Sequence, residues 1–110
     1  WTNYLGVEDM AAFINHTAGG YLFYKTPEYH RISRFRGNGV PMDRPGFYVY
    51  IRDNEKKDYH SISWQPVAKD LSKAKYRCRH GLSYTVYESE YDGLASSQTM
   101  VIPRGENVLL

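Results

Sequence analysis

Residues 82–102, LSYTVYESEYDGLASSQTMVI, contain two runs that alternate apolar and polar side chains around the dipeptide Asp92-Gly93. An Asp-Gly pair between two such runs is the strongest short signal of a β-hairpin, because glycine takes the positive φ that these turns need. We therefore expect antiparallel strands over residues 82–91 and 95–102. The alternation places Leu82, Tyr84 and Val86 on one face, which we expect to point into the core.

The same pattern continues on both sides of this hairpin. Residues 75–79, KYRCR, alternate apolar and charged side chains, and the turn at Pro103-Arg104-Gly105 is followed by an apolar run at 108–110. This part of the chain is predicted to be a meander of three strands and the start of a fourth. Because the chain begins at Trp1 and ends on an apolar run, we expect it to be a fragment of a longer protein.

The middle third has the features of a second strand pair. Residues 47–51 and 59–64 are rich in aromatic and β-branched side chains, and the charged residues 55–58 lie between them. Residues 38–46 contain two prolines and two glycines. They are expected to form a loop.

The first third admits two interpretations, a short helix over residues 8–15 or a hairpin that pairs residues 12–17 with 21–24. The aromatic second arm favours the hairpin. Aromatic residues make up 15% of the whole chain, a composition typical of pleated, half-buried surfaces. We predict an all-β protein, an antiparallel β-sandwich of about seven strands in one partial domain over residues 1–110.

Composition excludes several classes of protein. The 110 residues fit one domain, and a net charge of +2 is too balanced to indicate binding of nucleic acid or a membrane surface. No run approaches the roughly 18 apolar residues of a membrane helix. The single Cys78 excludes an intrachain disulfide framework and a metal cage of cysteines alone. We expect a soluble protein of the cytoplasm.

Candidate catalytic groups are few. The four histidines lack metal-ligand spacing, and no Gly-x-Ser-x-Gly nucleophile motif occurs. Cys78 stands between two arginines in a predicted strand, so alternation turns it away from them and indicates a small core thiol. Glu88 and Glu90 share a strand face that an exposed surface explains. The glycosylation acceptor pattern at Asn15 is common by chance.

Residues 31–37, RISRFRG, form a basic run with an aromatic residue inside it. Binding of nucleic acid would use the arginines on phosphates and Phe35 on a base, although the balanced charge disfavours this. A solvated strand would place Ile32, Arg34 and Arg36 together on one face. The third interpretation is a contact between these arginines and an acidic or hydroxyl-rich surface of a neighbouring domain.

Seven segments spread over the chain carry a further signal, namely residues 1–6 (WTNYLG), 18–24 (AGGYLFY), 31–36 (RISRFR), 44–50 (RPGFYVY), 63–67 (SWQPV), 79–84 (RHGLSY) and 101–107 (VIPRGEN). Together they resemble the amino-terminal β-sandwich domain of the glycoside hydrolase family 94 phosphorylases, which include cellobiose and chitobiose phosphorylases. Two places depart from that pattern. His60 stands where the resemblance leads us to expect Trp, and residues 37–39 are richer in glycine.

The resemblance implies a large enzyme in which a β-sandwich, a linker, an (α/α)6 barrel and a small β domain follow one another. Such enzymes split a β-linked disaccharide with inorganic phosphate, invert the anomeric carbon and release an α-sugar 1-phosphate. An Asp of the barrel is the general acid, and no metal or organic cofactor is needed. The barrel would lie beyond residue 110, so we expect no catalytic residue in this chain.

The resemblance also implies a homodimer in which this domain lies against the barrel and near the second subunit. We expect Arg34, Arg36, Asp43 and Arg44 to take part in that contact without doing chemistry, the arginines forming bidentate bonds. The alternative function is a free-standing carbohydrate-binding β-sandwich with a stacking platform of Tyr and Trp. Position distinguishes the two, because platform rings would be exposed together on one face.

Overall fold

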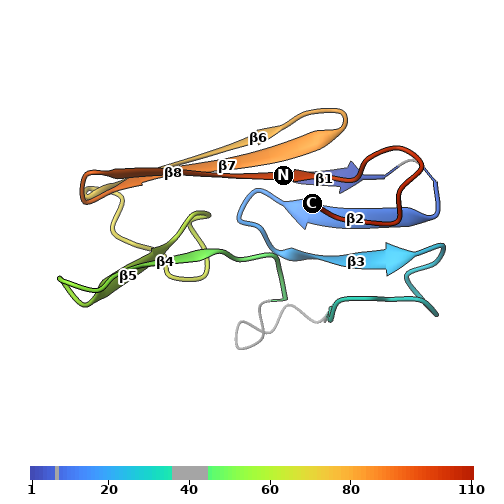
Figure 1. Cartoon of the computed structure of the whole chain (residues 1–110), viewed down its shortest axis with the longest axis horizontal. Helices are drawn as coiled ribbons and strands as arrows, with labels where there is room; N and C mark the ends of the chain where they lie inside the picture. Colours follow the sequence, from blue (N-terminus) through green and yellow to red (C-terminus); the bar gives the residue numbers. More distant parts are fainter. Residues whose placement is uncertain (7, 36–44) are drawn as a thin grey trace.

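The computed structural model describes residues 1–6, 8–35 and 45–110. Within these residues the chain contains strands and no helix, which confirms the predicted class. The strands are β1 (Thr2–Leu5), β2 (Met10–Asn15), β3 (Gly20–Tyr24), β4 (Tyr50–Asp53), β5 (Asp58–Ser61), β6 (Ala74–His80), β7 (Tyr84–Tyr91) and β8 (Leu94–Val101). They form three antiparallel sheets, in the orders β1-β2-β3, β4-β5 and β6-β7-β8 (Figure 1).

Strands β2 and β3 form the hairpin that the sequence favoured over a helix. Residues of β2 alternate between buried and half-buried, with Ala12 and Ile14 fully buried. Asn15 shapes the turn, because its Oδ1 accepts hydrogen bonds from the amides of Thr17 and Gly19, both at 2.9 Å. The pairing of β2 with the additional strand β1, which the sequence did not predict, rules out the helix.

The second sheet is the predicted pair of strands in the middle third, with shifted boundaries. β4 starts at Tyr50 and β5 ends at Ser61, three residues inside the predicted limits in each case. Asp53 closes the turn between them, because its Oδ1 accepts from the amides of Glu55 and Lys56 at 2.8 and 3.1 Å. The predicted loop over residues 38–46 lies largely outside the described residues.

The third sheet confirms the predicted meander. Asp92 and Gly93 both take positive φ, 51° and 79°, and join β7 to β8 in a two-residue turn. Beyond the turn at Pro103, Leu110 and Val101 exchange two backbone hydrogen bonds of 3.0 and 3.1 Å. These bonds are the expected start of a further antiparallel pairing.

The predicted inward face of β7 is wrong. Tyr84 and Val86 point outward, and Leu82 lies fully exposed ahead of the strand. Alternation separates the two faces of a strand but does not say which one meets the core. The opposite face is inward because the ring of Tyr87 is 1% exposed in the core and its hydroxyl donates to the carbonyl of Asn15 at 2.6 Å.

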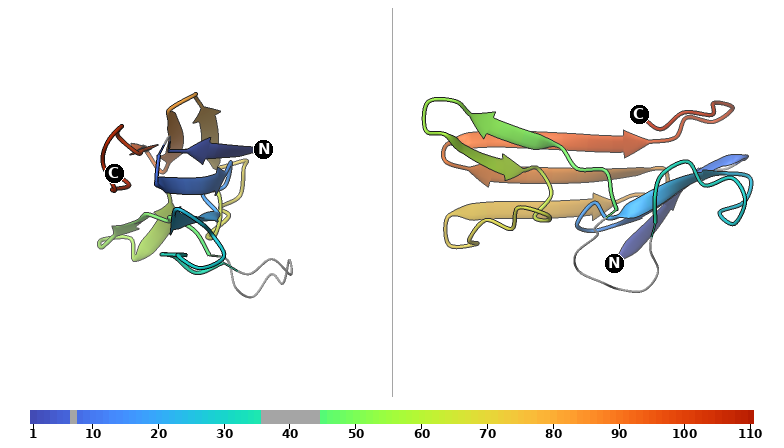
Figure 2. Two further views of the ribbon diagram at one scale, coloured as in Figure 1. Left: turned by 90° about the vertical axis from the view of Figure 1, so that its right-hand side faces the viewer. Right: turned by 90° about the horizontal axis from the view of Figure 1, so that it is seen from below.

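The first and third sheets contribute to one hydrophobic core, and Ile51 of the second sheet packs against it. Its buried members are Leu5, Met10, Ala12, Ile14, Ala18, Ile62, Tyr87, Met100 and Ile102. The β4–β5 hairpin lies over the end of the third sheet that carries the β7–β8 turn, and the first sheet lies toward the other end (Figures 1 and 2). Among the described residues, no helix has the length and apolar character that a membrane span requires.

Candidate interface and polar cluster

Aromatic side chains cover the outward face of the first sheet. Tyr4 in β1, Phe13 in β2 and Tyr21 in β3 are direct cross-strand neighbours, with ring centroids 5.1 and 5.8 Å apart. Phe23 and Phe35 extend the set, at 5.8 and 4.5 Å from Tyr21. We call these five residues the aromatic face. Such cross-strand pairs stabilise a sheet, because each ring buries part of its neighbour.

The rings of the aromatic face turn toward one another. The planes of Phe13 and Tyr21 are inclined by 28° at 5.8 Å, whereas those of Tyr4 and Phe13 are inclined by 73° at 5.1 Å, so the rings do not form one flat surface. A platform for stacking sugar rings would instead present flat sides outward and side by side. The geometry therefore disfavours the stacking-platform alternative at this face. A hollow of about 390 Å³ opens beside it, between Phe13, Phe35 and Tyr48.

The described part of the basic run, residues 31–35, borders the aromatic face and forms no regular strand. Just ahead of it, the carbonyl of His30 accepts from the amide of Tyr24 at 2.9 Å, but the amides of Ile32 and Ser33 then both donate to the carbonyl of Leu22, so regular strand pairing ends there. Arg31 lies with its guanidinium 5.9 Å from the ring of Tyr21 and 6.0 Å from that of Phe35, a cation–π arrangement.

Of the four residues predicted to make the domain or dimer contact, the structure describes one. Arg34 is exposed and stands next to Phe35 of the aromatic face. Arg36, Asp43 and Arg44 lie outside the described residues, so their role stays a prediction.

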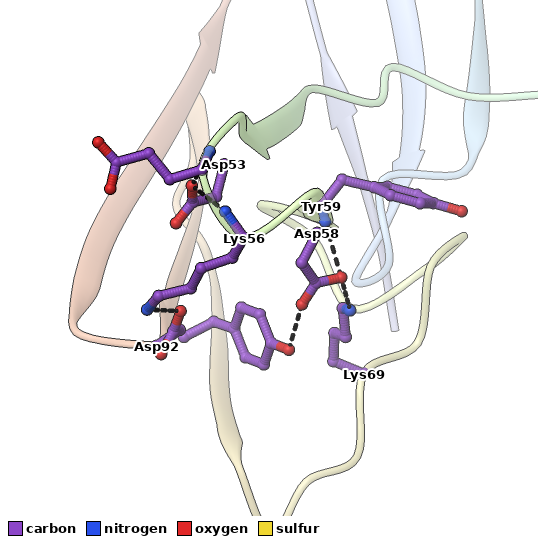
Figure 3. A network of polar contacts seen from close by, with 8 residues as sticks. Asp53, Lys56, Asp58, Tyr59, Lys69 and Asp92 are labelled. Atoms are coloured by element: carbon purple, nitrogen blue, oxygen red, sulfur yellow. Dashed lines mark hydrogen bonds and ion pairs between the residues drawn. The ribbon is translucent and has the colours of Figure 1, made fainter.

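A second group of functional interest is a polar cluster at the β4–β5 hairpin (Figure 3). Asp58 accepts from Nζ of Lys69 at 2.6 Å, from the Tyr91 hydroxyl at 2.7 Å and from the amide of Tyr59 at 2.8 Å. The Lys69 ammonium, the Tyr91 hydroxyl and this amide hold the pKa of Asp58 well below its ordinary value. Asp58 in turn raises the pKa of Lys69.

The same cluster connects two hairpins. Asp58 belongs to β5 and Tyr91 to β7, and nearby Lys56 donates to Asp92 in the β7–β8 turn (Figure 3). In the sequence, the charged residues 55–58 were evident as the connection between two predicted strands. Their partners at 69, 91 and 92 could not be, because no spacing in the chain links them.

Cys78, Glu88 and Glu90 lie where strand alternation indicated. Burial raises the pKa of the Cys78 thiol, which packs against the core as a small half-buried side chain. Glu88 and Glu90 lie on the outward face and pair with Arg79 and Lys75, at 2.8 and 2.9 Å. In the part of the chain that the structure describes, no group of three His, Cys, Asp or Glu residues is placed to hold a metal ion.

The sequence of this chain matches a known domain along its whole length. The match is to the supersandwich domain of glycosyl hydrolase 94, over residues 1–110. The chain belongs to that family. The resemblance carried by the seven sequence segments is thereby confirmed.

Three curated relatives illustrate this membership. An N,N'-diacetylchitobiose phosphorylase of Vibrio proteolyticus is 53% identical over 107 residues, and one of Vibrio furnissii is 51% identical over 107, each match covering 97% of this chain. A solabiose phosphorylase of Paenibacillus borealis is 32% identical over 108 residues, which is 91% of this chain. In each case the match spans 13% of the relative, so the chain corresponds to a small part of these enzymes.

Proposed function

We propose that this chain is the supersandwich part of an inverting disaccharide phosphorylase. The complete enzyme would cleave a β-linked disaccharide with inorganic phosphate and release an α-sugar 1-phosphate and a monosaccharide. The observation that carries the proposal is the 51–53% identity, over 97% of this chain, to two enzymes named N,N'-diacetylchitobiose phosphorylase. N,N'-diacetylchitobiose is therefore the first substrate to test.

In this proposal the chain serves packing, and the chemistry belongs to a helical barrel outside residues 1–110. The family resemblance supports a cytoplasmic homodimer that works without a metal or an organic cofactor. The aromatic face supports the packing role, because its rings pack against one another at different inclinations and do not form one flat platform. An uneven surface of aromatic rings suits contact with side chains of a protein better than stacking of a sugar ring.

Arginines complete the proposed contact surface. Arg31 lies over the aromatic face, and the exposed Arg34 stands beside it. Guanidinium groups next to aromatic rings are common at protein interfaces, where they bind carboxylates and carbonyls in bidentate fashion. We expect Arg34, Arg36, Asp43 and Arg44 to lie in the contact with the barrel domain or the second subunit.

The activity is tested on the complete polypeptide that contains these residues. It is incubated with N,N'-diacetylchitobiose or cellobiose, with and without inorganic phosphate, and the products are followed by phosphorus NMR. We expect phosphate-dependent formation of an α-sugar 1-phosphate and no activity of residues 1–110 alone. Sugar release independent of phosphate would contradict the proposed reaction, and turnover by residues 1–110 would contradict the packing role.

The packing role is tested by the double substitution Arg34→Ala and Arg36→Ala, with Arg79→Ala on the outward face of β6 as the matched control. Each charge-assisted bond that is lost from a buried contact weakens the assembly by about 1.5–3 kcal/mol. We expect the double variant to have a weaker dimer or a lower melting temperature, and the control to resemble the parent. An unchanged oligomer and melting temperature in the double variant would leave only the solvated basic run.

A further inference from the structure

A cleft of about 240 Å³ lies between the ends of the β4–β5 and β7–β8 hairpins. Ile51, Asp53 and His60 line it from the first hairpin, and Tyr91 and Leu94 from the second. We propose that this cleft binds one neutral sugar ring, at a site separate from the aromatic face.

The first observation behind this proposal is an unpartnered buried histidine. His60 is only 4% exposed, lines the cleft, and its Nε2 has no hydrogen-bond partner among the described residues. Buried polar atoms are almost always bonded, so an atom of this kind calls for a partner from the adjoining space. Burial and the nearby Lys69 charge lower the pKa of His60, which keeps the imidazole neutral at pH 7.

The second observation is that two carboxylates around the cleft each have one oxygen without a hydrogen bond to a described residue. Asp53 uses only Oδ1 in the β4–β5 turn, and Asp92 uses only Oδ2 toward Lys56. The other oxygen of each side chain makes no hydrogen bond to a described residue. Two free carboxylate oxygens beside a neutral imidazole are acceptors suited to hydroxyl groups.

Charge and size then restrict the class of ligand. Lys56 pairs with Asp92 and Lys69 with Asp58. The remaining charged residues of the lining, Arg52 and Asp53, have opposite signs, so the cleft has no excess charge that would select an ion. Ile51 and Leu94 give the cleft apolar lining that suits the C–H groups of a pyranose, and the Tyr91 ring, which also contacts His60 and Lys69, lies beside them. An engineered cavity of about 150 Å³ admits benzene, so 240 Å³ has room for one hydroxylated six-membered ring.

The experiment measures hydrogen exchange by mass spectrometry on the complete polypeptide that contains this chain. D-Glucose and N-acetyl-D-glucosamine are the probes, and D-glucuronate is the charged counterpart. With either neutral sugar at about 10 mM, we expect amides of residues 52–60 and 91–95 to exchange at least about twofold more slowly. D-Glucuronate should give no protection. Peptides of the first sheet serve as the internal reference.

The decisive variant is His60→Trp, which places a larger ring at the cleft, and its matched control is His30→Trp at an exposed position beside β3. We expect protection to disappear in the first variant and to persist in the second. Two results would overturn the proposal, namely no protection by either neutral sugar in the parent, or equal protection in parent and His60→Trp. Should His60→Trp fail to fold, Leu94→Trp narrows the cleft from its exposed side and is judged in the same way. Phosphorolysis is measured in a separate assay. A failure of the proposed function can therefore be told apart from a failure of this binding proposal.

Discussion

The outward faces of the first and third sheets both carry pairs of cross-strand neighbours, but the chemistry of these pairs differs. On the first sheet, the cross-strand neighbours Tyr4, Phe13 and Tyr21 pack ring against ring, edge-to-face in the first pair and nearly parallel in the second. On the third sheet, ion pairs occupy the corresponding positions, such as Lys75 with Glu90 directly across the strands at 2.9 Å. Both sheets contribute residues to one core, so the contrast lies in what each sheet presents outward.

This contrast separates a surface suited to water from a surface suited to contact. Exposed ion pairs contribute about 0–1 kcal/mol, and their charges stay hydrated. For every Å² of aromatic surface that a partner removes from water, the free energy of association becomes more favourable by about 25 cal/mol. The aromatic face is thus the one we expect to be covered in a complete enzyme, while the charged face stays in solvent.

The largest expected effect comes from replacing Gly20, the first residue of β3, and is compared with the effect of replacing Gly93 in the β7–β8 turn. Gly20 has φ near +152°, and a Cβ built there would lie 1.9 Å from the carbonyl oxygen of Phe13. Because that obstacle is backbone, we expect Gly20→Ala to lower the free energy of unfolding by at least about 3 kcal/mol. Urea unfolding followed by circular dichroism measures the loss.

Gly93 in the β7–β8 turn is the matched control. It has φ of +79°, but a Cβ there would meet no atom within 4 Å. Gly93→Ala should therefore lose only the left-handed backbone preference, about 1–2 kcal/mol. Equal losses in the two variants would contradict the steric difference between the two sheets.

A smaller effect distinguishes the inner from the outer side of one strand. The Tyr87 hydroxyl is buried and bonds the Asn15 carbonyl in the first sheet, whereas Tyr84 lies 45% exposed on the other side of β7. We expect Tyr87→Phe to lower the free energy of unfolding by about 1 kcal/mol, the ordinary net value of one hydrogen bond. Tyr84→Phe should change it by less than about 0.5 kcal/mol. The reverse order would mean that the face first predicted from the sequence is the inner one.

Local patterns predicted most of the strands, because a hairpin depends on neighbouring residues. The turn at Asp92-Gly93 and the alternation around it need no information from elsewhere in the chain. The inner face of β7 was missed because both of its faces carry aromatic rings, and the contact of Tyr87 with Asn15 spans 72 positions. No local sequence pattern indicates long-range contacts of this kind.

The candidate sites also divide into those that local sequence indicates and those that form only through long-range contacts. The seven-segment resemblance identified the family, and strand alternation placed Cys78, Glu88 and Glu90 correctly. The side-chain contacts of the Asp58 cluster join residues 11–36 positions apart, so the sequence could not indicate them. The position of His60 was noticed only as a departure from the family pattern.

The Asp58 cluster includes a tyrosine hydroxyl as well as an ammonium group, unlike the ion pairs of the charged face. Its contribution to stability should therefore depend on pH. Lys69 and Tyr91 keep the pKa of Asp58 low in the folded chain. A carboxyl whose pKa is lowered stabilises the fold above its ordinary value of about 4, and loses that contribution as the pH falls toward the folded value. Asp58→Asn should thus be less stable than the parent at pH 7, with the difference shrinking below about pH 4. Urea midpoints over a pH series measure this, and a difference that does not depend on pH would contradict it.

The smallest effect belongs to the charged face itself. Glu88 pairs with Arg79 at 2.8 Å on the outward face of the third sheet, so Glu88→Gln should cost less than about 1 kcal/mol. The loss should vanish near 1 M salt, where the Debye length is about 3 Å. Its counterpart on the first sheet is Phe13→Ala, which removes ring contacts to Tyr4 and Tyr21, each contributing about 0.5–1.5 kcal/mol beyond the buried area. That larger loss should persist in salt, because it does not arise from net charges. If salt instead reduced both losses alike, the two faces would not differ in kind, and the assignment of the aromatic face to a protein contact would lose its physical basis.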